Sequence, residues 1–487
     1  MRDMVLVLSF NEAAGRAVAR KLRGERFYCK IVPGNMTAAQ ARNEAPLGLI
    51  LAGGAEGSEE LEAFDPELLL MGVPILALGD AALGLSAQLG GKAGEEMLPR
   101  QVAPVHYEEG PLFEEMSDSE RLLENVRPMT LPETLAPVFI AMDSTLGFAH
   151  RSLPIYGIQI QMEPNDPDGV QILVNFAQSL CGCTPWWDND SFVERAVAEI
   201  RRIVGDEGRA ICAMSGGVDS GVCALLGHMA IGHRLQCIFV DTGLLRKDES
   251  EQVAAFYQDT MGLNLRRIEA GDRFIAALKG VSKDSEKQRI IDQLLADVLQ
   301  EALKECEGAQ VLLRGLNYND LIDSVSETDP LVQLFDEGAL QVVDPVRDLF
   351  KDEIRRVGDD LGLPPSIVGR QPFPGGGLAL RIMGEVTDEK ITVLREADAI
   401  FRQEVEQSGQ SRKLWQHFAM LCPSPIDGSM IICLRAVHAS DGTKAMPGRL
   451  PYDLLERTTA RIMETLPISR VLYDLTPSTH YKGIQWQ

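Results

Sequence analysis

Residues 214–220, which read Met-Ser-Gly-Gly-Val-Asp-Ser, constrain the fold of this chain more than any other stretch. Apolar residues 210–213 before them predict a buried strand, and apolar residues 222–226 after them predict a helix. The two glycines allow a tight turn that directs several backbone N–H groups toward one point, where the helix start adds partial positive charge. Ser215 and Ser220 add hydroxyl donors. The stretch therefore predicts a polyphosphate-binding turn.

This turn is not of the Walker type, because no Gly-Lys-Ser or Gly-Lys-Thr follows the glycines. The alternative is a glycine-rich connection between a strand and a helix that binds no ligand. The order of strand, glycine turn and helix favours phosphate binding, because it presents a helix N-terminus at the end of a strand.

Composition limits the partners of the chain. Its 487 residues, 45% of them hydrophobic, are enough for two or three domains with cores of their own. The net charge of −24 predicts no binding to nucleic acid or to an anionic membrane, since both demand a basic surface. No apolar run reaches membrane length, and the first residues lack the pattern of a signal peptide. We expect a cytoplasmic protein.

The nine cysteines are scattered, and only Cys181 and Cys183 lie close together in the sequence. No second close pair completes the pattern of a zinc site. The number is odd and several cysteines lie in apolar runs, which predicts buried free thiols.

Hydrophobic periodicity divides the chain into three segments. The first alternates short strands with helices, and a second α/β segment contains the glycine turn. The last segment, from about residue 370, reads as a small α+β unit. The predicted strands are 5–8, 28–32, 47–51, 74–78, 156–160, 235–240, 311–313, 430–434 and 471–473, and the predicted helices are 11–23, 81–89, 388–405 and 454–466.

The Ser-Gly-Gly-x-Asp-Ser turn resembles the PP-loop of ATP pyrophosphatases, which cut ATP between its α and β phosphates. Further stretches, together with the order of the segments, resemble the GMP synthase family, which aminates XMP to GMP. These stretches are 215–220, 237–247, 273–274, 277–281, 349–355, 370–375 and 473–476. The resemblance covers nearly the whole chain.

The resemblance implies three domains. Residues 1–187 would form a class I glutamine amidotransferase-like (flavodoxin-like) domain, and residues 192–367 a PP-loop ATP pyrophosphatase domain. Residues 370–487 would form an α+β dimerisation domain, which implies a homodimer.

The first domain departs from its family at the positions that do the chemistry. Residues 74–79 resemble the strand that ends on the nucleophilic cysteine, but Gly79 holds that place. Residues 156–163 resemble the strand that carries the His and Glu of the triad, and here Gln161 replaces the His while Glu163 remains. Thioester formation needs a thiolate, and an amide cannot act as a base near neutral pH. We therefore expect no glutamine hydrolysis.

The nucleotide site is expected at the glycine turn. Asp219 and Lys351 are the expected catalytic groups, and Asp219 is also a tentative ligand of Mg²⁺, which prefers carboxylate and phosphate oxygens. The alternatives are a helix N-terminal charge for Asp219 and a solvated surface lysine for Lys351. The expected ATP-binding residues are Ser215, Gly216, Gly217, Val218, Asp219, Ser220, Val240 and Gly315.

The acceptor site is implied by the resemblance at Arg246, Arg370 and Gln485. The alternative for Arg246 is a surface ion pair with Asp248 or Glu249. Gln485 replaces a Glu of the family, and residues 328–337 lack the Lys and His of its lid. Replacing Glu by Gln changes the hydrogen-bond pattern, so the acceptor could differ from XMP.

Three functions remain open from the sequence. The first is ATP- and Mg²⁺-dependent amination of XMP with ammonia, which a separate glutaminase could supply. The second is a PP-loop ligase for another purine-like acceptor, and the third is a non-catalytic nucleotide-binding paralogue.

Overall fold

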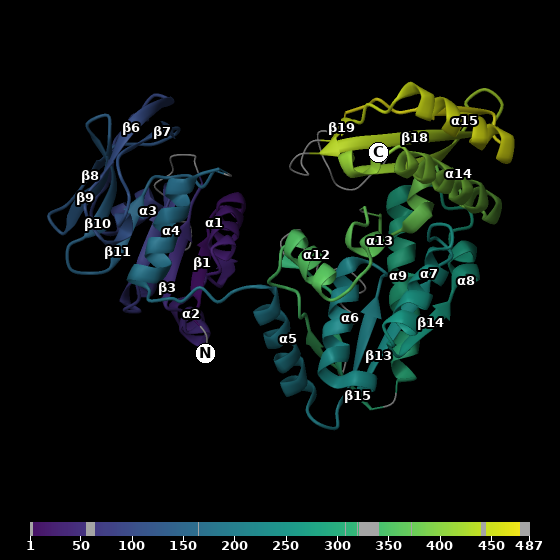
Figure 1. Cartoon of the computed structure of the whole chain (residues 1–487), viewed down its shortest axis with the longest axis horizontal. Helices are drawn as coiled ribbons and strands as arrows, with labels where there is room; N and C mark the ends of the chain where they lie inside the picture. Colours follow the sequence, from purple (N-terminus) through teal and green to yellow (C-terminus); the bar gives the residue numbers. More distant parts are fainter. Residues whose placement is uncertain are drawn as a thin grey trace. The chain divides into compact units, whose positions relative to one another are not determined.

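In the computed structural model the chain is an α/β protein, as predicted, and it divides into two compact units, Met1–Phe192 and Val193–Gln487 (Figure 1). Each unit has its own central sheet. The structure describes residues 3–54, 64–163, 165–306, 308–318, 320, 340–371, 373–439 and 445–477.

Nine described strands form the sheet of the first unit, in the order β2-β1-β3-β4-β11-β10-β9-β6-β7. The five strands from β2 to β11 are parallel to one another. Most of their residues are apolar and buried, as is typical of a parallel sheet covered on both faces. Their bounds, close to the predicted ones, are β1 Val5–Ser9, β2 Cys29–Pro33, β3 Gly48–Ala52, β4 Ile75–Leu78 and β11 Ile155–Ile158.

Side-chain caps mark the starts of two helices of this unit, α1 and α4. Asn11 accepts a hydrogen bond from the Ala14 N–H (3.1 Å), and Asp166 accepts one from the Gly169 N–H (2.9 Å). The two helices that follow these caps, α1 and α4, pack against each other beside the sheet. The helices are α1 Glu12–Gly24, α2 Ala38–Glu44, α3 Asp80–Gln88 and α4 Pro167–Asn175.

The other half of the sheet is antiparallel, which the sequence analysis did not predict. It consists of β6 Gln101–Tyr107, β7 Ser119–Leu123, β9 Leu135–Ala141 and β10 Ser144–His150, beside a small ribbon of β5 Lys92–Ala93 and β8 Met129–Thr130. In β6 exposed and buried residues alternate, so the strand lacks the continuous apolar run that identifies a buried parallel strand.

The second unit contains a parallel sheet of five described strands in the order β14-β13-β12-β15-β16. From β12 the chain proceeds to β13 and β14 on one side and then returns to β15 on the other. This reversal places a crevice at the carboxyl end of β12. The strands are β12 Arg209–Met214, β13 Leu235–Asp241, β14 Leu265–Glu269, β15 Ala309–Leu313 and β16 Gln341–Val343.

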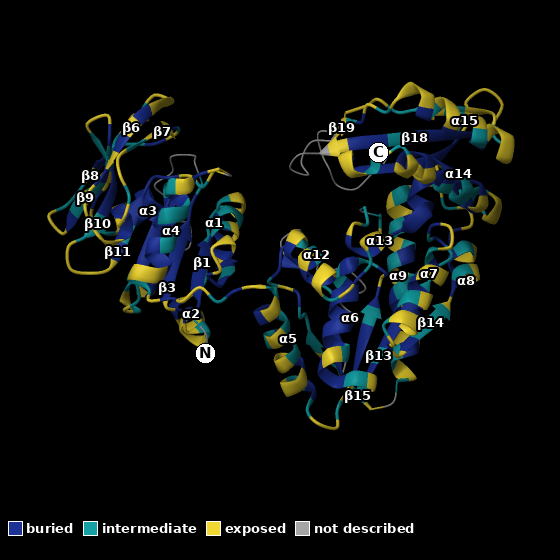
Figure 2. Cartoon of the chain, in the orientation of Figure 1, coloured by how far each residue is buried: buried dark blue, intermediate teal, exposed yellow. Residues whose placement is uncertain are grey.

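Helices cover this sheet, and α6 follows β12 directly. Figure 2 shows that β13 is buried, whereas α5 carries exposed residues on its outer face. The helices are α5 Asn189–Val204, α6 Val218–Ile231, α7 Glu249–Ala255, α8 Gly271–Ala277, α9 Asp284–Lys304, α12 Lys351–Asp360 and α13 Pro365–Val368.

The C-terminal segment of this unit begins with the short 3₁₀ helix η6 Gly377–Arg381. Strand β18 pairs antiparallel with β17 and β19 and parallel with β20. Strand β17 was not predicted, because it opens with the polar residues Gln416 and His417, although both are buried. The elements are α14 Asp388–Gln407, β17 Gln416–Pro423, β18 Met430–Ala439, β19 Ala445–Pro447, α15 Tyr452–Thr465 and β20 Arg470–Tyr473.

One hydrophobic cluster joins the five-stranded sheet to the C-terminal segment. It includes Ile238 of β13, Leu299 of α9, Leu378 of η6, Leu394 of α14 and Ile432 of β18. The sheet and the C-terminal segment therefore share a core, and the three-domain division at residues 187, 192, 367 and 370 stays a prediction.

All nine cysteines are free, as predicted. Across the described ranges, no helix has the length and apolar character needed to cross a membrane.

Candidate active site

The turn between β12 and α6 is held by its two serines. The backbone N–H of Ser215 donates to Oγ of Ser220 (3.1 Å), and the two hydroxyl groups are hydrogen-bonded (3.1 Å). Oγ of Ser215 also accepts a hydrogen bond from the Gly217 N–H (3.3 Å). Gly217 is the N-cap of α6, so the free N–H groups of the first helical turn lie beside these hydroxyls. The predicted strand, turn and helix are confirmed.

Two glycines allow this geometry. Gly216 has a φ of +73°, a backbone conformation that residues with a side chain rarely adopt. Gly315, just after β15, lies so close to α6 that an added Cβ would be 2.7 Å from the Ser220 backbone N. The expected close approach of Gly315 is therefore to the turn between β12 and α6.

Asp219 and Lys351 form an ion pair at this turn, although they are 132 residues apart in the sequence. Lys351 is the first residue of α12, which packs against α6. Oδ1 of Asp219 is buried and has no hydrogen-bond partner among the described residues. This oxygen fits the needs of Mg²⁺, a hard cation that prefers carboxylate oxygens.

A cavity of about 500 Å³ opens at the carboxyl ends of β12 and β13. Its lining brings together the predicted residues Ser215, Gly217, Val218, Asp219, Val240, Lys351 and Arg370. The sequence analysis missed Phe239, Thr242, Leu295, Leu299, Arg355, Gln371 and Phe373, which also line it. Arg355 lies one helical turn after Lys351, a spacing that could have identified it. Leu295 and Leu299 have the same spacing on α9, but this pattern is equally typical of core residues.

Arg370 links the segment before η6 to the turn between β12 and α6. Its Nη1 donates to the carbonyl of Gly216 (2.8 Å), and its Nη2 pairs with Glu249 of α7. Arg370 therefore contacts the turn itself, whereas the resemblance assigned it to the acceptor.

Arg246 is buried, so its alternative as a surface residue is wrong. Its guanidinium lies 4.4 Å from the ring centroid of Phe373, and its Nε is 3.7 Å from Oδ2 of Asp398. Asp398 also faces the buried Arg381, at 3.4 Å. Within the described part of the chain, Nε and Nη2 of Arg246 have no hydrogen-bond partner.

The Asp398 carboxylate faces two buried guanidinium groups, those of Arg246 and Arg381. Burial lowers the pKa of Arg246 to about 9, although the carboxylates of Asp398 and Glu249 oppose that shift. Burial and the charge of Arg402, reinforced by Arg246, lower the pKa of the neighbouring His417 to about 4. An anionic or carbonyl-bearing ligand would give Arg246 further charge compensation and hydrogen bonds.

Gln485 and the segment 328–337 lie outside the described residues.

In the first unit, Gly79 sits at the turn between β4 and α3 with φ +61°. A Cβ added here would be 2.5 Å from the carbonyl oxygen of Gly54. The same carbonyl accepts the N–H of Asp80 (3.0 Å), the donor that follows the nucleophile position. In a nucleophile elbow this N–H belongs to the oxyanion hole. Here it is already engaged, and the space for a side chain is filled.

Gln161 and Glu163 line a cavity of about 310 Å³ in the same unit. Among the described residues of its lining, Gly79 is not present. The cavity also contains Arg121, which makes hydrogen bonds of 2.6 and 2.8 Å to the carboxylate of Asp166. The three degenerate positions therefore do not line one cavity.

Comparison with known proteins identifies relatives of this chain. The model of the GMP synthase C terminal domain matches residues 403–481. Relatives called GMP synthase [glutamine-hydrolyzing] are 35% identical in Clostridium perfringens and 36% identical in Carboxydothermus hydrogenoformans, and each match covers all of both chains. A third relative of that name, from Clostridium acetobutylicum, is 35% identical over the same full extent. At this identity over its full length, the chain belongs to the GMP synthase family.

Proposed function

We propose that the protein aminates XMP to GMP with ATP and free ammonia. The observation that carries this proposal is the 500 Å³ cavity, in which the PP-loop, the Asp219–Lys351 pair and Phe373, the partner of Arg246, come together. The relatives are called glutamine-hydrolyzing GMP synthases, which supports XMP as the acceptor. The closed turn at Gly79 supports ammonia as the nitrogen source.

The reaction would proceed in two steps. A purine oxygen of XMP attacks the α-phosphorus of ATP, the bond to the bridging oxygen breaks, and pyrophosphate leaves. Ammonia then attacks the activated purine carbon, loses a proton and displaces AMP. The outer phosphates would be held by the PP-loop N–H groups and by the hydroxyls of Ser215 and Ser220. Lys351 would leave its ion pair with Asp219 and pair with the departing pyrophosphate instead.

Asp219 would hold Mg²⁺ through its unpaired Oδ1 together with the phosphates. When bound, the cation neutralises charge on the leaving pyrophosphate. Val240, Leu295 and Leu299 would pack around the adenine, because they form the apolar side of the cavity.

The acceptor would be recognised at Arg246. Its Nε, 3.7 Å from Asp398, and its Nη2 make no hydrogen bond to the described residues, and such donors suit a phosphate or a purine carbonyl. The 500 Å³ cavity lined by Phe373 is also compatible with another purine-like acceptor. The first experiment therefore compares acceptors.

The first prediction concerns substrates. With ATP, Mg²⁺ and XMP, ammonium should support release of pyrophosphate and AMP, whereas glutamine should support none above the background without a nitrogen donor. A coupled pyrophosphate assay and chromatography of the nucleotide products measure both. Turnover with another purine nucleotide but not with XMP would identify a different ligase, and no turnover with any acceptor would indicate a non-catalytic paralogue.

The second prediction concerns the ion pair at the turn. Lys351→Ala and Asp219→Asn should each lower kcat by about 100-fold or more, because each removes charge from the site of the outer phosphates. Lys413→Ala, at an exposed lysine far along the sequence, is the matched control and should keep wild-type rates. Rates within threefold of wild type for both active-site variants would contradict their role.

The third prediction concerns the first unit. Gly79→Cys combined with Gln161→His should release no glutamate from glutamine, because the Gly54 carbonyl occupies the space and engages the Asp80 N–H. Glutamate is measured by an enzyme-coupled assay, and retained ammonium-dependent activity shows that the variant is folded. Steady glutamate release would contradict the prediction and would mean that restoring the two side chains is enough for glutamine hydrolysis.

The fourth prediction concerns assembly. We propose a homodimer formed through the C-terminal segment, supported by the family match there and by Leu472 and Leu475, which are 49% and 67% exposed. Light scattering should give twice the chain mass of 53.4 kDa. Leu472→Asp should lower that mass toward one chain, and an unchanged mass would place the interface elsewhere.

A further inference from the structure

The loop between β13 and α7 is held from a distant part of the chain. Each of its residues from Gly243 to Lys247 contacts a residue beyond position 376. Arg395 donates from Nη2 to the Gly243 carbonyl and from Nε to the Leu245 carbonyl (2.9 Å). The Leu378 N–H donates to the Leu244 carbonyl (2.8 Å). The last two residues make side-chain contacts: Arg246 faces Asp398 (3.7 Å), and Lys247 pairs with Glu396 (2.8 Å).

The N–H groups and the carbonyl groups of the loop backbone find their hydrogen-bond partners in different parts of the chain. Its N–H groups are bonded locally, because the Gly243 N–H donates to Asp241 (2.9 Å) and the Arg246 N–H donates to Glu249 (2.9 Å). Its three consecutive carbonyls, by contrast, accept from the C-terminal segment. Buried backbone carbonyls without partners are costly, so the loop needs that segment to keep this conformation.

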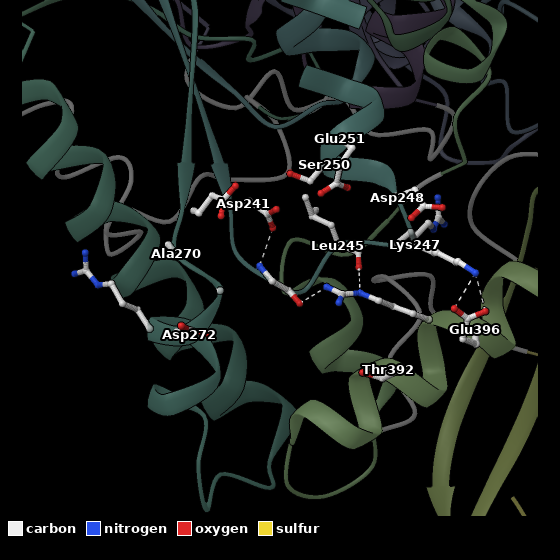
Figure 3. A pocket seen from close by; sticks show the side chains of 16 residues that line it. Asp241, Leu245, Lys247, Asp248, Ser250, Glu251, Ala270, Asp272, Thr392 and Glu396 are labelled. Atoms are coloured by element: carbon white, nitrogen blue, oxygen red, sulfur yellow. Dashed lines mark hydrogen bonds and ion pairs between the residues drawn. The ribbon is translucent and has the colours of Figure 1, made fainter. Parts of the chain in front are cut away.

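Cavities lie on both sides of the loop. Leu245 lines the 500 Å³ nucleotide cavity and also a second cavity of about 740 Å³, bounded by α7, α8 and α14. Figure 3 shows the second cavity, with Lys247 and Glu396 directed toward each other across its edge. Leu244 packs in the shared hydrophobic core, while hydrogen bonds and ion pairs hold the residues around it.

Arg395 makes two of these contacts with one side chain. Its planar guanidinium reaches two carbonyls that are two residues apart in the loop, and the next residue after them is Arg246. A lysine ammonium is a point charge on a flexible stem and does not reproduce such a fork.

We propose that Arg395 is a positioning residue for the acceptor: from α14 it holds the loop 243–247 so that the guanidinium of Arg246 stays against Phe373, which lines the nucleotide cavity. The inference rests on the proposed function only in naming the acceptor. It also makes acceptor binding depend on α14, an element outside the PP-loop sheet.

The first test separates positioning from general damage. Arg395→Ala should raise KM for XMP about tenfold and change KM for ATP by less than about threefold, because a displacement near 1 Å already weakens a positioned contact. Arg395→Lys should recover less than half of the loss. Arg412→Ala, at an exposed arginine in the turn after α14, is the control and should match wild type.

A double-mutant cycle tests whether Arg395 affects acceptor binding through Arg246. If Arg395 acts through Arg246, Arg395→Ala should have little further effect on KM for XMP in the Arg246→Ala background. Additive effects, or equal rises in both KM values together with a lowered melting temperature, would overturn the proposal.

Hydrogen exchange tests the loop without using activity. In Arg395→Ala the amides of Gly243, Leu244 and Arg246 should exchange about tenfold faster, while amides of α6 stay protected. Unchanged exchange in the loop would overturn the positioning role. If the wild-type protein does not turn over XMP, the proposed function fails and this measurement still decides the role of Arg395.

Discussion

Parallel pairing of β12 with β13 on one side and β15 on the other is the constraint on which the site depends. It brings the carboxyl ends of three strands to one edge, and the chain must leave that edge in different directions. The turn after β12 can then approach the segment after β15 so closely that Gly315 has no room for a side chain. The same edge carries Val240, and α12 brings Lys351 to the turn from a later part of the chain.

The electrostatics of the site follow from unequal pairing. Lys351 pairs with one oxygen of Asp219, and the other oxygen has no hydrogen-bond partner among the described residues. Asp398 faces both Arg246 and Arg381 beside Phe373, and Nε and Nη2 of Arg246 make no hydrogen bond within the described part of the chain. Burial raises the free energy of such incompletely paired groups, so binding of a negatively charged or oxygen-rich ligand stabilises them.

The first unit combines a well-packed sheet with a closed turn at Gly79. Its parallel strands keep the buried apolar residues that stabilise the sheet, and α3 still starts after a residue of positive φ. At that turn, however, the Gly54 carbonyl binds the Asp80 N–H and fills the space beside Gly79. The absence of a side chain at residue 79 and the engagement of the Asp80 N–H are thus two aspects of one local arrangement.

The sequence by itself determined the elements that depend on local pattern: the continuous apolar runs of β1, β3, β12 and β13, the glycine turn at 214–220, and the substitutions at Gly79 and Gln161. Strand β6 escaped prediction because exposed residues alternate with buried ones along it, and β17 because its buried start is polar. Only the tertiary structure decided which side chains meet. Asp219 with Lys351, Arg246 with Asp398, and the loop carbonyls with Arg395 are pairs more than 130 residues apart, and their contacts come from packing around a shared core, which no local pattern encodes.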